Sequence, residues 1–301
     1  MAVAWATMKP GHERRLRAGH LWIYQGNVDE VDGEAAPGDV VDVRSAAGDF
    51  LGRGYYNPRS QIAIRLLARE PEEIDYAFFV ERIRRARAWR ERWMPEATAF
   101  RLVYSEGDLL PGLIVDRYED VLVAQFLTLG MDVRRDMIVQ ALREVEAPAA
   151  IYERSDVPSR RYEGLEERTG LLWGKLPPQP MVMRENGLSF EIDVTTGQKT
   201  GYFLDQKENR RSLAPLVSGA RVLDVFCHNG TFALHALRYG AQEVVGVDSS
   251  AQAVELARRN AELNGFAEAA RFVEANAFDF LRELDRTGER FDAVVLDPPA
   301  F

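Results

Sequence analysis

Four short apolar runs alternate with helical segments between residues 221 and 296, and this alternation constrains the fold more than any other feature of the chain. Strands are expected at 221–226, 243–247, 271–274 and 291–296, with helices between them at 231–239, 251–263 and 277–284. Strands separated by helices form a parallel sheet, because a crossover helix lets each strand run in the same direction as the last. The sequence therefore predicts a doubly wound α/β sheet here.

A polar residue stands at or near the end of each run: Asp224, Asp248, Asn276 and Asp297. In open parallel sheets, ligands bind beyond the carboxyl ends of the strands. The Asp248 carboxylate is suited to accept hydrogen bonds from two ribose hydroxyls, although an acidic residue at this position can also be a plain helix cap. The turn at 227–231 has one glycine where a dinucleotide site needs three. A ligand with a ribose but no phosphates fits better, which points to S-adenosylmethionine (SAM).

Other residues around these strand ends complete the expected cofactor site. Asn276 could bind the adenine edge while Ala277 supplies a backbone N–H. The segment 199–206 precedes the sheet and is expected to fold over the cofactor; its aromatic rings could instead only pack the first helix. The predicted cofactor set is Tyr202, Phe203, Asp205, Gln206, Asp224, Phe226, Cys227, Asn229, Asp248, Ser249, Asn276, Ala277 and Asp297.

The last five residues, Asp-Pro-Pro-Ala-Phe at 297–301, follow the fourth run. Such a sequence at a strand end is the target-base signature of methyltransferases that modify planar nitrogen heterocycles. Prolines stiffen the backbone, so a carboxylate and nearby carbonyls are ready to accept hydrogen bonds while a ring stacks on the base. We expect Asp297, Pro298 and Phe301 to form the catalytic pocket for a base flipped out of its stack.

The composition limits the other functional classes. The single cysteine, Cys227, excludes an internal disulfide framework, and the four histidines have no ligand spacing, so no metal is expected. No run approaches the roughly 20 apolar residues of a membrane span, and we expect a cytoplasmic protein without a membrane partner. Cys227 is the only candidate for the thiolate that methylation of pyrimidine carbon 5 requires. Its position in the turn expected to bind the cofactor favours a role in lining the cofactor site, or as a buried structural thiol, instead.

Three segments are expected. Residues 1–72 have short glycine-punctuated strands typical of a small barrel, residues 73–187 combine an amphipathic helix at 76–94 with an α+β unit, and residues 188–301 hold the parallel sheet. A hairpin is predicted between 188–194 and 199–203. A helix should then open at Asp205, which has capping-box spacing to Glu208.

Several motifs resemble the bacterial 23S rRNA 5-methylcytosine methyltransferases that carry an N-terminal PUA domain. They include 8–15 (MKPGHERR), 52–59 (GRGYYNPR), 110–118 (LPGLIVDRY), 197–206 (GQKTGYFLDQ) and 226–230 (FCHNG). His228 departs from that family's tyrosine, and Asn276 stands where aspartate is more usual. The resemblance implies a PUA-like barrel, an α+β middle domain and a Rossmann-like class I methyltransferase sheet truncated after its fourth strand.

The resemblance also implies 23S ribosomal RNA as partner and suggests a homodimer. Barrel-region residues expected to bind RNA are Lys9, Arg14, Arg15, Arg17, Arg53 and Arg59. In that family a later motif supplies the cysteine nucleophile and three further strands follow. We therefore expect a fragment that leaves 291–296 as an exposed apolar edge, binds SAM weakly and does not turn over.

Three alternatives stay open: methylation of an exocyclic nitrogen or of guanine, a non-catalytic SAM-binding RNA-binding protein, and a DNA methyltransferase. The sequence does not identify the modified nucleotide.

Overall fold

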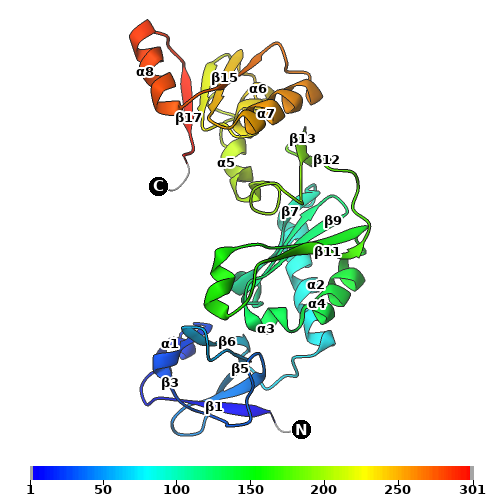
Figure 1. The fold of residues 1–301 in the computed structure, drawn as a ribbon, viewed down its shortest axis with the longest axis vertical. Coiled ribbons are helices and arrows are strands. Elements are labelled where there is room, and N and C mark those ends of the chain that lie inside the picture. Colours follow the sequence, from blue (N-terminus) through cyan, green and yellow to red (C-terminus); the bar gives the residue numbers. More distant parts are fainter. Residues whose placement is uncertain (1–2, 299–301) are drawn as a thin grey trace. The chain divides into compact units, whose positions relative to one another are not determined.

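A computed structural model describes residues 3–298, and Figure 1 shows the order of the elements along the chain. The chain divides into two compact units. The first runs to Pro177 and includes Val194–Thr200; the second contains Pro178–Asp193 and the residues from Gly201 onward. Among the described residues, no helix is both long and apolar enough to cross a membrane.

The first unit begins with a curled six-stranded sheet in the order β2-β6-β5-β4-β1-β3. All neighbours are antiparallel except β1 and β4. Gly54 lets β5 and β6 approach closely, since a Cβ there would lie 2.2 Å from the backbone oxygen of Arg65. The strands are β1 (Ala4–Met8), β2 (Trp22–Tyr24), β3 (Val28–Val31), β4 (Val40–Arg44), β5 (Phe50–Tyr56) and β6 (Ile62–Ala68), and the short helix α1 covers Arg14–Arg17.

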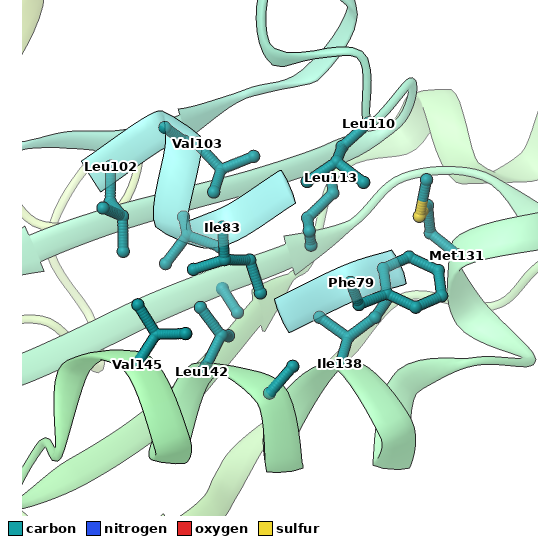
Figure 2. Close-up of a cluster of buried hydrophobic side chains, with 14 of the residues drawn as sticks. Phe79, Ile83, Leu102, Val103, Leu110, Leu113, Met131, Ile138, Leu142 and Val145 are labelled. Atoms are coloured by element: carbon teal, nitrogen blue, oxygen red, sulfur yellow. The ribbon is translucent and has the colours of Figure 1, made fainter. Parts of the chain in front are cut away.

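A five-stranded mixed sheet in the order β11-β10-β9-β8-β7 follows in the same unit. Helices α2 and α4 pack together, and Figure 2 shows Phe79 and Ile83 of α2 among Ile138, Leu142 and Val145 of α4. The elements are α2 (Tyr76–Trp93), β7 (Ala99–Tyr104), β8 (Leu113–Tyr118), β9 (Val121–Phe126), α3 (Leu129–Asp132), α4 (Arg135–Glu146), β10 (Ala150–Ser155) and β11 (Arg168–Gly174).

Buried polar contacts join the curled sheet to the mixed sheet within this unit. Glu163, on the 3-10 turn after β10, accepts hydrogen bonds from the side chains of Asn57, Ser60 and Arg65. The Tyr55 hydroxyl donates to the backbone oxygen of Pro111 at 2.8 Å. Since every one of these side chains is buried, the contacts fix the two sheets against each other.

The predicted hairpin between 188–194 and 199–203 is wrong. β13 (Leu188–Ile192) pairs instead with the preceding strand β12 (Met181–Glu185), through a tight turn at Asn186-Gly187. Both turn residues have positive φ, 50° and 81°, as expected of an Asn-Gly hairpin. No strand is found at 199–203. The Asn-Gly pair was the sequence signal that identifies the correct partner.

The second unit contains the predicted parallel sheet, with strands in the order β16-β15-β14-β17. Helices α6 and α7 lie on one side of the sheet and α8 on the other (Figure 1). Leu223, Val225, Val245 and Val247 alternate along two strands and pack beneath α8. The elements are β14 (Arg221–Val225), α6 (Thr231–Arg238), β15 (Glu243–Asp248), α7 (Ala251–Leu263), β16 (Ala270–Glu274), α8 (Ala277–Thr287) and β17 (Ala293–Leu296).

Two details differ from or refine the sequence expectations. The helix predicted to open at Asp205 begins at Lys207, as α5 (Lys207–Arg211), after a 3-10 turn at Leu204–Gln206, and Gln206 is its N-cap without a side-chain cap bond. The capping-box prediction is therefore wrong. The expected exposed edge is confirmed, because β17 borders the sheet and its Val294 and Leu296 are exposed.

Candidate cofactor and base site

The strand order places a site at the carboxyl end of β14. Successive strands run outward from β14 to β16, and the chain then returns to the other side of β14 as β17. Open α/β sheets bind ligands in the crevice where the strand order reverses. Val225 pairs with Val247 on one side and with Leu296 on the other. The next residues in this row are Phe226, Asp248 and Asp297, so the two carboxylates flank the same turn.

The turn after β14, Phe226–Gly230, has a constrained backbone. Phe226 and His228 have φ of 65° and 48°, and Gly230 has φ of 78°. A left-handed backbone is unfavourable for residues that carry a Cβ, most of all for bulky ones. Such conformations persist where the surrounding structure enforces them, and they concentrate at ligand sites. The turn is therefore preformed rather than adaptable.

Asp248 is one of the groups that enforce this turn. One carboxylate oxygen accepts the backbone N–H of His228 at 2.9 Å, and the other accepts that of Ser250 at 2.9 Å. Asp248 thus stabilises the turn, but it is not the helix cap of the alternative prediction, because the N-cap of α7 is Ser250, whose side chain accepts the N–H of Ala253. Each carboxylate oxygen can accept more than one hydrogen bond, so the same group retains capacity for ribose hydroxyls.

Asp224 is a buried carboxylate beneath the turn, 1% exposed. It accepts the backbone N–H of Ala233, in the first turn of α6, at 3.0 Å. Burial raises the pKa of Asp224 to about 7, and the negative charges of Asp297 and Asp248 contribute in the same direction. The three carboxylates therefore lie close enough to repel one another, which makes this site favourable for a positively charged ligand.

The described part of the base-pocket motif lies beside the first helix. Asp297 accepts a hydrogen bond from the Gln206 side chain at 3.2 Å, and Asn209 donates to Gln206 at 2.6 Å. Asp297 and Pro298 are exposed, as a base-accepting element must be. Phe301, the remaining predicted catalytic residue, lies outside the described residues.

In the segment predicted to cover the cofactor, some side chains are buried in the protein and others lie beside the turn or are exposed. Tyr202 is buried and donates to Glu185 at 3.1 Å, while the Arg210 guanidinium lies 4.8 Å from its ring centre. This placement favours the packing alternative for Tyr202. Phe203 is partly exposed and meets the His228 ring edge-on at 5.4 Å, which keeps it beside the turn. Asp205 is exposed.

The strand-end residues nearest α7 and α8 have different roles. The Asn276 side chain accepts the backbone N–H groups of Phe278 and Asp279 and so caps α8. Ala277 is buried in the cluster beneath that helix. Ser249 is exposed between β15 and α7. Asn276 remains at the site edge, but its oxygen is already used by the helix.

Cys227 is a packed thiol. It is buried, and a Cβ on Gly246 would lie 3.0 Å from its sulfur. Burial raises the pKa of the Cys227 thiol, with Asp224 and Asp248 adding to the effect. A thiol in such surroundings stays protonated and unreactive, which argues against Cys227 as a nucleophile.

Some residues at the site were missed by the sequence reasoning. Phe278, the second residue of α8, is exposed and lies 6.4 Å from the Phe226 ring. Asn260 of α7 donates to the backbone oxygen of Asn229 at 3.1 Å and so supports the turn, whereas the Asn229 side chain is buried. The sequence signal for Phe278 was an aromatic residue two positions after Asn276, at the start of the helix that follows the third strand.

The basic residues predicted to bind RNA are dispersed. Arg53 is 8% exposed, and its guanidinium binds both carboxylate oxygens of Asp42; this buried ion pair is a correction to its predicted role. Lys9 is exposed but donates to the backbone oxygen of Gly26. The other four predicted residues are exposed: Arg14, Arg15, Arg17 and Arg59. Within residues 3–298, no cluster of side chains suitable for a metal ion is found.

Comparison with known proteins decides the family. Residues 6–69 match a PUA-like domain, and residues 123–301 match the S-adenosylmethionine-dependent methyltransferase family. The chain belongs to the S-adenosylmethionine-dependent methyltransferases. The cofactor expected from the strand ends is thereby confirmed.

This methyltransferase is similar to proteins named ribosomal RNA large subunit methyltransferase I. The relative from Aeromonas hydrophila is 43% identical over 296 residues, which is 97% of this chain and 75% of the relative. The relative from Shewanella denitrificans is 44% identical over 299 residues, 98% of this chain and 75% of the relative.

Solved structures share the fold of this methyltransferase. A SAM-dependent methyltransferase from Streptococcus mutans has a TM-score of 0.81 at 24% identity, covering 97% of this chain and 76% of that one. A methyltransferase crystallised with SAH has a TM-score of 0.84 at 24% identity, covering 100% and 77%. The predicted PUA-like, mixed and Rossmann-like architecture is confirmed.

The residues of this methyltransferase fit a bound SAM. The carboxylates around Phe226 suit the cationic sulfonium and amino groups, and Phe203, Phe226 and Phe278 offer apolar surface for a purine ring. The Nδ1 atom of His228 is buried and has no hydrogen-bond partner among the described residues, which leaves a polar atom for a ligand at this turn.

Proposed function

We propose that this protein methylates carbon 5 of a cytosine in 23S ribosomal RNA, with SAM as the methyl donor. The observation that carries the proposal is the row formed by Asp248, Phe226 and Asp297 at the point where the strand order reverses. Asp248, which would bind the cofactor, and Asp297, which would bind the base, stand at the ends of the two strands that flank the turn after β14. The proteins named as large-subunit rRNA methyltransferases, 43–44% identical to this chain, supply the substrate class.

On the cofactor side, each residue would have a distinct task. Asp248 would bind the ribose hydroxyls while holding the backbone of His228. Phe226 and Phe278 would offer apolar surface to the adenine ring, since their rings lie edge to face beside the turn, with centroids 6.4 Å apart. Asp224 would contribute negative charge from beneath the turn without contacting solvent. When bound, SAM supplies an electrophilic methyl group.

On the base side, Asp297 would receive the target base. Its exposed carboxylate is oriented by Gln206, which is in turn held by Asn209. A carboxylate fixed in this way can accept hydrogen bonds from the exocyclic amino group of cytosine. Pro298 stiffens the following backbone, so the base would enter a prepared position. A base inside a duplex is out of reach of such a site, which is why a flipped or unpaired base is required.

Carbon 5 and exocyclic-nitrogen methylation differ in one requirement. For carbon 5 of cytosine to attack the methyl group, a thiolate must first add to carbon 6 of the ring. The buried Cys227 is unsuited to supply that thiolate. The carbon 5 proposal therefore requires a thiolate other than Cys227. Methylation of the exocyclic nitrogen requires none, and the exposed Asp297 carboxylate favours it as the second candidate.

The PUA-like barrel would bind the RNA backbone. Arg14 and Arg15 of α1 are exposed, and no ion pair is described for either within residues 3–298. Arg17 has a long, exposed ion pair with Asp49 at 3.5 Å, which costs little to break. The guanidinium groups of α1 are thus available for phosphate contacts.

The test is nucleoside mass spectrometry of ribosomal RNA from a bacterial strain that lacks the gene. We expect the loss of one 5-methylcytidine, restored by the wild-type gene and not by an Asp248→Ala allele. Asp279→Ala is the matched control, because Asp279 is an exposed aspartate of the same sheet unit and its carboxylate pairs with Arg282 on its own helix. It should restore the modification.

Other outcomes discriminate among the candidates. Loss of N4-methylcytidine instead of 5-methylcytidine would establish the exocyclic-nitrogen reaction. An unchanged nucleoside pattern would contradict both reactions. Binding of SAM to the purified protein, measured by calorimetry, should weaken at least about tenfold in Asp248→Ala, the loss of one or two charged hydrogen bonds.

A further inference from the structure

A groove in the first unit is lined by residues of that unit alone. It has a cavity volume of about 430 Å³ and is lined by Arg82, Arg85, Trp89, Arg90, Tyr104 and Asp108, among others. We refer to these six residues as the Arg–Trp groove. Its volume falls within the range of small-ligand sites. None of its lining residues belongs to the candidate cofactor and base site.

Helix α2 separates this groove from the hydrophobic core. Phe79 and Ile83 face inward and are buried among the side chains drawn in Figure 2. Arg82, Arg85 and Trp89 are spaced by three and four residues, which places them along one stripe of the helix. The inward stripe packs in the core, whereas Trp89 on the second stripe is an exposed large apolar side chain.

Two large aromatic side chains are exposed at the groove. Trp89 is 57% exposed and Tyr104, at the end of β7, is 56% exposed. The Trp93 ring lies 5.7 Å from the Trp89 ring and is also exposed. Exposed aromatic faces beside guanidinium groups are the surface on which proteins stack unpaired bases.

The charges at the groove are arranged for an anionic ligand. Arg90 is held in place by both oxygens of Asp108, and Arg82 by Glu72 at 3.0 Å. Arg85 is exposed, and no ion pair or hydrogen bond is described for it within residues 3–298. Because Glu72 and Asp108 offset Arg82 and Arg90, Arg85 gives this groove one excess positive charge in a chain whose net charge is −9.

We propose that the Arg–Trp groove binds an unpaired nucleotide of the RNA substrate, with its base on Trp89 or Tyr104 and its phosphate at Arg85. This inference rests on the proposed function for the identity of the polymer as RNA. A duplex would hide its base faces from these rings, so the groove would select single-stranded segments. It would be an anchoring site that fixes the RNA without taking part in methyl transfer.

The test is fluorescence anisotropy of a labelled oligouridine with the full chain, at one fixed salt concentration. At least one of Trp89→Ala and Tyr104→Ala should weaken binding by about tenfold, as expected for the loss of one stacked base. Trp89→Phe, which keeps an aromatic face, should stay within about threefold of the wild type. Arg85→Ala should lower the slope of log affinity against log salt by about one.

Trp173→Ala is the matched control, because Trp173 is an exposed tryptophan of the same unit outside the groove, beneath the Arg143 guanidinium. It should bind as the wild type does. Ultraviolet cross-linking of the oligouridine, mapped by mass spectrometry, should mark the peptides that contain Trp89 and Tyr104.

Three results would overturn the inference. The first is unchanged affinity of a Trp89→Ala, Tyr104→Ala double variant. The second is a wild-type chain that does not bind oligouridine. The third is a change in self-association, seen by sedimentation, without a change in RNA affinity, since the groove would then bind a second copy of the chain. The rRNA nucleoside analysis is independent of these results, so either proposal can fail alone.

Discussion

At the scale of single residues, the sequence predicted positions in the sheet more reliably than the partners of each side chain. Asp224, Asp248 and Asp297 were placed correctly at one sheet edge, because parallel strands all end on the same side. Their burial was not predictable from spacing. Tyr202 and Arg53 look functional in sequence, yet each is buried against a carboxylate that no local pattern relates to it. Whether a polar side chain is available to a ligand depends on the residue with which it forms a hydrogen bond or ion pair in the fold.

The raised pKa of Asp224 predicts a pH-dependent stability. Its folded-state pKa of about 7 lies above the ordinary 3.8, so the folded protein binds more protons between these values and its stability falls as pH rises through that window. Asp224→Asn should remove the free-energy cost of burying a charged carboxylate, while the asparagine side-chain oxygen still accepts the N–H of Ala233. We expect the variant to be more stable than the wild type at pH 8, on the order of 4 kcal/mol, and nearly equal to it near pH 4.

Urea unfolding of both proteins across this range measures the difference. His235 titrates in an overlapping window with the opposite sign, since burial lowers its pKa to about 4, and subtraction of the two curves removes its contribution. A constant difference at all pH values would contradict the assignment.

At the scale of elements, the parallel unit was predicted nearly residue by residue, with α7 found at the expected 251–263. Each helix there follows a strand and buries one face, so local pattern and tertiary contacts agree. The hairpin failed because residues 199–203 have strand-like composition but belong to a segment that packs through side chains. Tyr202 of that segment contacts Glu185, and this contact is not visible in a strand pattern.

The ion pair between Arg210 and Glu185 connects α5 to the β12–β13 hairpin. Both side chains are 1% exposed and form two hydrogen bonds, at 2.6 and 3.0 Å. Arg210→Ala should lower the free energy of unfolding by about 3–5 kcal/mol, because it leaves a buried carboxylate without its partner. Arg258→Ala, which removes an exposed pair with Glu255, should change it by less than about 1 kcal/mol. Chemical denaturation compares the two, and equal effects would refute the importance of burial.

At the scale of the whole molecule, the sequence predicted the barrel and the α+β unit but not how they are joined. Glu163 and Arg65 are far apart in the chain and form a buried ion pair at 2.8 Å. Long-range polar contacts have no sequence period, so neither residue was identified. The structure places both in one compact unit, with Glu163 at the junction of its two sheets.

Removal of the Glu163 carboxylate should loosen this junction. Glu163→Ala removes the carboxylate that accepts from Arg65, Asn57 and Ser60 and leaves the buried Arg65 without its ion-pair partner, at a cost of roughly 3–5 kcal/mol. Limited proteolysis should then cut between the curled and mixed sheets, near 69–75, faster than in the wild type. Glu167→Ala, which removes an exposed pair with Arg161, is the control and should be cut at the wild-type rate.

The packing of Cys227 against Gly246 has a practical consequence. Because the chain has one cysteine and its sulfur is enclosed beside the strained turn, an alkylating reagent can reach it only when that turn opens. The labelling rate of the native protein therefore reports the opening equilibrium of this one loop. Saturating S-adenosylhomocysteine should slow the modification in proportion to its affinity, and an equal rate with and without it would show that the nucleoside does not occupy the crevice above the thiol.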